Sequence, residues 1–115
     1  MIAVIFEVVP VRGRAADYFR LAGLLRPELE AIEGFVSIER CESLTNPGKI
    51  LSLSFWRDEK AIAEWRNRPA HRGAQEQGRM RVFADYRLRI AEVRRDCGMA
   101  DRREAPKDSR SIHKA

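Results

Sequence analysis

The sequence predicts an α+β fold, a ferredoxin-like antiparallel sheet with βαββαβ order, and three observations lead to it. Stretches rich in β-branched residues alternate with stretches that carry apolar residues at helical spacing. Their order is strand, helix, strand, strand, helix, strand. An Asn-Pro-Gly turn signal joins the two middle strands. Because the chain has 115 residues, it has room for one core and one domain.

The first strand is expected over residues 2–9, where even-numbered residues face one way and odd-numbered residues the other. Both sides are apolar except at Glu7. A helix follows over 15–26, with apolar residues at i, i+3, i+4 and i+7 spacing. Pro27 lacks an N–H, so we expect the helix to kink or end near Arg26 and to restart with Pro27 in its first turn. Gly34 then stops it.

Residues 35–42 and 50–56 are expected to form a hairpin around "SLTNPGK". Asp58 is a candidate N-cap for a helix that runs to about Asn67, and Pro69 starts a further helical segment that ends near Gly78. Residues 86–93 alternate again and form the last strand.

The expected sheet order is 4-1-3-2, with both helical regions on one face. Two helices cover only one face of four strands, and strand 1 is apolar on both sides, so a second copy is expected to cover the other face in a homodimer. The domain spans 1–95. Residues 96–115 are charged, contain Gly and Pro, and lack periodicity, so this tail is expected to be disordered or to clasp the dimer partner.

Composition excludes several classes of function. The net charge of +5 is spread over alternating charges and the tail, without the basic patch that nucleic acids require. Two cysteines without metal or CxxC spacing indicate free thiols and a reducing, cytoplasmic location. We find no signal peptide, no membrane-length apolar run, and no glycine-rich nucleotide loop, nucleophile elbow or metal motif.

Three stretches resemble the antibiotic biosynthesis monooxygenase family: "GFVSIER", "NPGKILSLSFWRDEKAIAEWRNRPAHRGAQEQGR" and "FADYRLRIAEV". The resemblance covers about residues 2–95. It implies a dimeric α+β barrel, in which two sheets pack face to face and each subunit holds a cavity between sheet and helices. Some such proteins oxygenate aromatic substrates with O₂ and without metal, flavin or nicotinamide. Others cleave haem, and the haem-degrading branch resembles this chain in having a Trp and a later His, here Trp65 and His71. That branch carries an Asn on strand 1 where this chain has Glu7, and a carboxylate there disfavours an anionic haem.

Trp65 and His71 are the candidate catalytic residues. Trp65 is expected either to fill the core or to form a cavity wall that binds the substrate. His71 either caps the restarted helix or, with an ordinary pKa near neutrality, acts as the base that deprotonates a phenol. Glu7 and Arg87 are candidate substrate contacts, and the structural alternative is a cross-strand ion pair of Glu7 with Arg87 or Arg89.

The resemblance, together with these residues, implies a cofactor-independent monooxygenase, with no metal, that oxidises a small phenolic or quinol-like compound. One alternative is a dimer that binds a small hydrophobic molecule without turnover, and a further alternative is a haem-degrading monooxygenase. No membrane or nucleic-acid partner is expected.

Overall fold

A computed structural model describes residues 1–77 and 82–112 of the chain. Its elements are β1 (Ile2–Pro10), α1 (Ala15–Glu30), β2 (Phe35–Glu42), β3 (Ile50–Trp56), α2 (Glu59–Arg66), α3 (Pro69–Gln77), β4 (Phe83–Glu92) and α4 (Lys107–Ile112). The middle hairpin has the predicted bounds. The last strand begins three residues earlier than predicted, and the predicted helix end at Gly78 lies outside the described residues.

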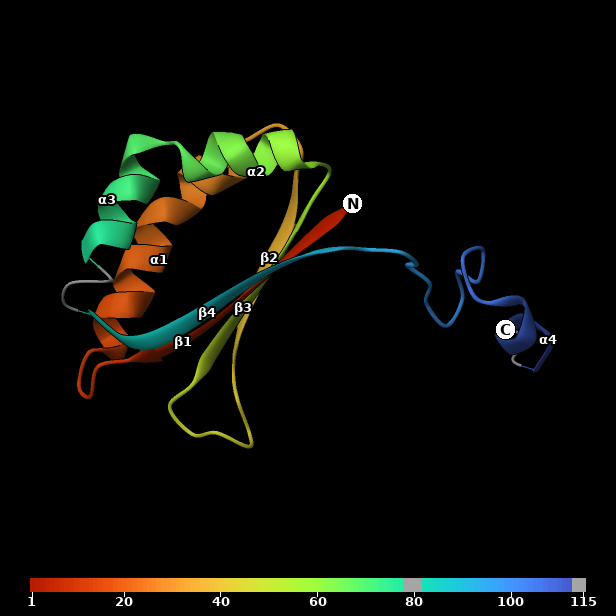
Figure 1. Ribbon diagram of the computed structural model, residues 1–115, viewed down its shortest axis with the longest axis horizontal. Coiled ribbons are helices and arrows are strands. Elements are labelled where there is room, and N and C mark those ends of the chain that lie inside the picture. The colour runs from red at the N-terminus through yellow and green to blue at the C-terminus, as the bar shows by residue number, and fades with distance from the viewer. Residues whose placement is uncertain (78–81, 113–115) are drawn as a thin grey trace.

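The four strands form one antiparallel sheet in the order β2-β3-β1-β4. Helices α1, α2 and α3 lie together on one side of it (Figure 1). The α+β ferredoxin-like prediction, including the 4-1-3-2 order, is therefore confirmed. We call the covered side of the sheet the helix face and the opposite side the outer face.

Strand register decides which residues belong to each face. Val8 pairs with Ile50, and Ile2 pairs with Trp56. These residues belong to or pack against two buried clusters under the helices. The clusters consist of Leu29, Ile32, Trp56, Ala61 and Ile62 at one end and Val8, Tyr18, Ile50 and Val82 at the other. The even-numbered residues of β1 therefore face the helices, and the odd-numbered residues, including Glu7, face outward.

One predicted helix boundary is confirmed, the N-cap at Asp58, whereas α1 ends at Glu30 and not at the predicted stop, Gly34. The Asp58 carboxylate accepts a hydrogen bond from the Ala61 backbone N–H at 3.0 Å, as an N-cap residue does. Gly34 has a φ of +94°, which L side chains rarely adopt, and a Cβ added there would lie 2.9 Å from the Ala61 Cβ. Glycine at position 34 thus allows α2 to pack close to the start of β2.

The predicted break at Pro27 is wrong in one respect, because α1 continues through it to Glu30. Pro27 lies in the last turn of α1, and its missing backbone N–H removes only one hydrogen bond from the helix. Burial of Leu29 and an ion pair between Arg26 and Glu30 at 2.7 Å stabilise the segment on both sides of the proline.

Beyond β4 the chain leaves the domain. Residues 96–112, which we call the arm, extend away from the sheet and helices and carry the short helix α4 (Figure 1). The sequence shows no periodicity that predicts α4.

Candidate functional site

Trp65 and His71 are in direct contact on the helix side of the sheet. Their ring centroids lie 4.6 Å apart at an interplanar angle of 72°, an edge-to-face arrangement. Both side chains are half-buried, and Trp65 packs against the buried cluster around Trp56. Trp65 therefore contributes to the core, as one of the two interpretations of this residue predicts, and also presents its ring to His71.

The bend between α2 and α3 brings the two rings together. Asn67 follows the last residue of α2 and donates its side-chain N–H to the Ala63 carbonyl at 2.8 Å. The Arg72 guanidinium donates to the Asn67 Oδ1 at 2.7 Å, which connects α3 to the end of α2. Pro69 begins α3 with the φ angle that a first helical turn needs. A continuous helix would separate residues 65 and 71 by about 240° around its axis.

The environment of His71 departs from the expectation of an ordinary pKa. Burial, and secondarily the positive charge of Arg72, lower the pKa of His71 to about 4. Its Nδ1 is buried and has no hydrogen-bond partner among the described residues. At neutral pH the imidazole is therefore uncharged, and one of its two polar atoms is free to bond to a ligand.

Much of the helix face is aromatic and aliphatic. Phe6, Tyr18, Phe83 and Tyr86 form a chain of ring contacts with centroids 5.7 to 6.0 Å apart. Tyr86, Leu88 and Ile90 share this face with the β1 core residues but remain 40 to 49% exposed. The helices thus leave part of the edge strand β4 uncovered, and this uncovered row suits a flat or aliphatic ligand.

Small polar residues occupy the middle of the same face. Ser52 and Ser54 are both buried on β3, and the Trp56 indole N–H donates to the Ser54 hydroxyl at 2.9 Å. Arg40 lies opposite Ser52 on the edge strand β2, and its Nε is buried without a hydrogen-bond partner among the described residues. Sequence analysis did not single out Arg40, although the alternation of β2 places it on the same face as Ile38.

Glu7 lies on the outer face and is held by two cations. Its Oε2 accepts from the Lys49 Nζ and from the Arg89 Nη1, each at 3.3 Å. The hydrogen bond from Lys49, followed by the charges of Lys49 and Arg89, holds the pKa of Glu7 below its ordinary value despite partial desolvation. The predicted ion pair with Arg89 is confirmed. Arg87, although directly opposite Glu7 in the register, is not its partner.

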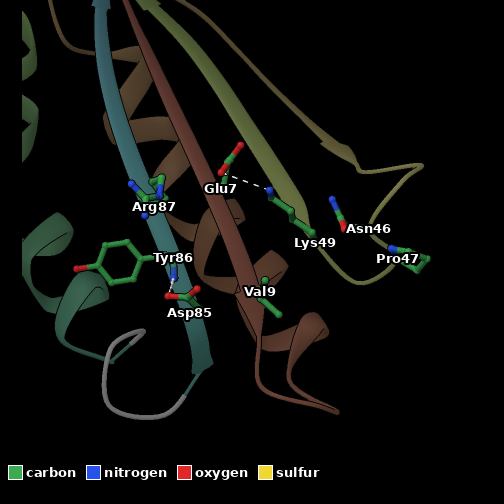
Figure 2. A pocket seen from close by; sticks show the side chains of 8 residues that line it. All are labelled: Glu7, Val9, Asn46, Pro47, Lys49, Asp85, Tyr86 and Arg87. Atoms are coloured by element: carbon green, nitrogen blue, oxygen red, sulfur yellow. Dashed lines mark hydrogen bonds and ion pairs between the residues drawn. The ribbon is translucent and has the colours of Figure 1, made fainter.

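A pocket of about 350 Å³ opens on this outer face, between the β2–β3 hairpin and β4. Figure 2 shows Glu7 and Lys49 bonded to each other beside Arg87, whereas the Tyr86 ring points away from the other lining side chains. Besides Tyr86, the lining residues are Glu7, Val9, Asn46, Pro47, Lys49, Asp85 and Arg87. Both signs of charge are present, so the pocket does not select ligands by charge.

The four candidate residues therefore fall into two groups. Trp65 and His71 meet on the helix side, whereas Glu7 and Arg87 lie together on the outer face. The structure does not bring Glu7 or Arg87 to a cavity that contains the Trp65–His71 pair. Period-two alternation of β1 separates them, since Glu7 points away from its neighbours Phe6 and Val8.

Two classes of site find no support in the part of the chain that is described. No group of three His, Cys, Asp or Glu side chains is arranged to hold a metal ion within residues 1–77 and 82–112. Over the same residues, no helix is long and apolar enough to cross a membrane. Cys41 and Cys97 are both free thiols at the surface.

Comparison with known sequences identifies relatives over most of the domain. The chain is 50% identical over 93 residues to a jasmonate monooxygenase from Pyricularia oryzae, covering 81% of this chain and 43% of that protein. It is 32% identical over 62 residues to the uncharacterized protein YqjZ from Bacillus subtilis, covering 54% of this chain and 53% of YqjZ. The matches thus span about half the length of these relatives.

Solved structures share the fold at low sequence identity. Rv0793 from Mycobacterium tuberculosis superposes with a TM-score of 0.75 at 18% identity, covering 84% of this chain and 98% of that one. A Deinococcus radiodurans protein gives a TM-score of 0.75 at 17% identity, covering 85% of this chain and 97% of that one.

The family comparison agrees with the sequence motifs and with the sheet order. Residues 1–77, which include β1, the hairpin and the Trp65–His71 pair, match the family described as antibiotic biosynthesis monooxygenase. The chain therefore belongs to the antibiotic biosynthesis monooxygenase family and has the fold of the dimeric α+β barrels.

Proposed function

We propose that this protein is a monooxygenase that inserts oxygen from O₂ into a small, mostly apolar organic compound held beside Trp65 and His71. The observation that carries the proposal is the contact between these two rings, with a buried His71 Nδ1 that has no hydrogen-bond partner among residues 1–77 and 82–112. Binding sites for small molecules are typically apolar and contain a few polar groups of this kind. Family membership and the likeness to a jasmonate monooxygenase support the proposal.

The class of substrate determines what else the reaction needs. When one oxygen atom of O₂ enters the substrate and the other leaves as water, two further electrons are required. A phenol or quinol can supply these electrons itself, so it needs no cofactor. A jasmonate is not phenolic, and its unactivated C–H bonds require an external electron donor. We propose a jasmonate-like compound as the first substrate class, because of the 50% identity, and phenols as the second.

The pKa of His71 bears on the choice between a jasmonate-like and a phenolic substrate. A phenol has an ordinary pKa of about 10, well above the pKa of about 4 of His71, so transfer of its proton to this imidazole is strongly unfavourable. A neutral imidazole is better suited to a hydrogen bond with a substrate hydroxyl or carbonyl group. We therefore assign His71 a role in orienting the substrate and polarising its oxygen. Trp65 would form the adjoining wall.

Turnover with ¹⁸O₂ tests the proposal. The purified protein is incubated with jasmonate or with a panel of naphthols, with and without a reductant, and the products are analysed by mass spectrometry. We expect one labelled oxygen atom in the product. His71→Ala should lower turnover about 10- to 100-fold, the effect of losing one buried hydrogen bond to the substrate. Gln75→Ala, an exposed residue on the same helix, is the matched control and should have no effect.

Unlabelled products throughout would overturn the monooxygenase proposal. In that case calorimetric binding of the same compounds would support the alternative of a dimer that binds small molecules without turnover. Haem cleavage is distinguished by haemin, because a haem-degrading protein should shift the Soret band and then lose it under reductant.

A further inference from the structure

The arm does not belong to the compact body of its own chain. The radius of gyration is 16.7 Å and the longest extent is 51 Å. A compact chain of 115 residues has a radius of gyration of about 13 Å. Figure 1 shows the reason, since the arm continues from β4 away from the sheet and from the α1–α3 helices.

The arm nevertheless has defined local structure. The Gly98 N–H donates to the Asp101 carbonyl at 2.8 Å, and the Arg102 guanidinium donates back to the Gly98 carbonyl at 3.2 Å. Ala105 is buried at 5% exposure, and α4 follows it. The arm thus combines a hydrogen-bonded turn with the short helix that follows it.

This structure is not stabilised by the chain's own domain. Helix α4 has six residues, none of them buried, whereas isolated helices shorter than about 12 to 15 residues are marginal in water. Met99 and Ile112 are 87% and 74% exposed. Two exposed large apolar side chains, one in the turn before α4 and one at its end, indicate a surface that becomes buried against another molecule.

The origin of the arm indicates which molecule that is. Val93, directly after β4, donates its N–H to the Met1 carbonyl at 3.0 Å, so the arm leaves the domain at the end of the sheet. The outer face of that sheet exposes apolar side chains, with Leu53 at 37% and Val9 at 39%. A second copy seated on this face would lie at the root of the arm and within its reach.

We propose that residues 96–112 clasp a second copy of this chain, and that Met99 and Ile112 are buried on that copy. The arm is then an interaction element that extends the interface beyond the outer face of the sheet. Its short helix is stabilised by the partner, in the manner of a segment that gains its tertiary contacts on association.

Cross-linking in the full chain tests this directly. Cys97 lies in the arm and is exposed, so a photoreactive maleimide attached to it in a Cys41→Ser background probes what the arm touches. We expect irradiation to give a covalent dimer. The same label on Leu24→Cys in a chain without Cys41 and Cys97 is the control, since Leu24 is 67% exposed on α1 and should not cross-link two copies.

Sedimentation of full-length variants measures the contribution of the arm. Met99→Asp and Ile112→Asp together should raise the dimer dissociation constant at least tenfold, because two apolar side chains lose their buried contacts. Leu24→Asp should leave the constant unchanged. A cross-linked product confined to single chains, a dissociation constant unaffected by the arm variants, or a wild-type chain that sediments as a monomer at micromolar concentration would each overturn the proposal.

Discussion

The two faces of the sheet differ in whether their polar groups have partners. On the outer face, the Glu7 carboxylate is partly exposed and has two cationic partners within 3.3 Å. On the helix face, the Nδ1 of His71 and the Nε of Arg40 are buried and have no partner among the described residues. A buried polar atom without a hydrogen bond costs about 1 to 3 kcal/mol, so proteins rarely keep one unless a ligand or function requires it. The helix face therefore has the features of a ligand site.

The outer face has the features of an association surface. Glu7, Lys49 and Arg89 form ion pairs within the chain, and nearby residues of this face, such as Leu53, Val9 and Ile5, are apolar. Because Glu7 already has two cationic partners, another copy can cover this part of the face without leaving the Glu7 carboxylate unpaired. The same alternating strand, β1, thus serves the proposed substrate on one side and the proposed dimer on the other.

The largest effect is expected from a substitution in the outer face that weakens the proposed dimer. Leu53→Asp places a charge among apolar residues of the proposed interface, and we expect the dimer dissociation constant to rise about 100-fold or more. Analytical ultracentrifugation at several concentrations measures the change. Leu53→Ala should have a much smaller effect, since it removes contacts without adding a charge. An unchanged constant for Leu53→Asp would show that the two copies associate through another surface.

An intermediate effect is expected on the pH dependence of stability, and it tests the burial of His71 on the helix face. Because the pKa of His71 is lowered to about 4, the unfolded chain binds a proton below pH 6.5 that the folded chain does not. The contribution of the uncharged His71 to the free energy of unfolding is therefore fully present above about pH 6.5 and is lost as the pH decreases toward 4. After allowance for the partial exposure of His71, this loss should be about 1 to 2 kcal/mol. In urea titrations at pH 7 and pH 4.5, His71→Asn should remove this part of the pH dependence. If the free energy of unfolding of His71→Asn fell by as much between pH 7 and pH 4.5 as that of the wild type, the lowered pKa of His71 would be contradicted.

The smallest effect is expected at Glu7. The lowered pKa means that its carboxylate contributes stability above the ordinary value of 4.5, and that this contribution is lost as the pH falls through the lowered pKa. Glu7→Gln should lower the thermal midpoint slightly at pH 7, less so in high salt, and should leave turnover unchanged. Scanning calorimetry at two salt concentrations, together with the ¹⁸O₂ assay, measures both. A loss of turnover as large as that of His71→Ala would place Glu7 with the substrate after all.

Much of the fold follows from local sequence signals. The strands 35–42 and 50–56 were predicted to the residue because alternation and the turn at "NPG" both act over a few positions. The cap at Asp58 is equally local, whereas α1 ends at Glu30 before it reaches the predicted stop at Gly34. The contact between Trp65 and His71 was partly predictable, since Pro69 indicates a bend between them, although the direction of that bend is not encoded locally.

The sequence by itself determined the order of the elements, the sheet order and the residue types available for chemistry. Only the tertiary structure decided which of these residues meet. It extended α1 through Pro27, paired Glu7 with Arg89 and Lys49, and lowered the pKa of His71. It also buried the Arg40 Nε where no other described residue accepts a hydrogen bond from it. The physical reason is distance along the chain. Periodicity and capping depend on neighbours a few residues apart, whereas burial and electrostatics depend on groups that the fold brings together from positions tens of residues apart.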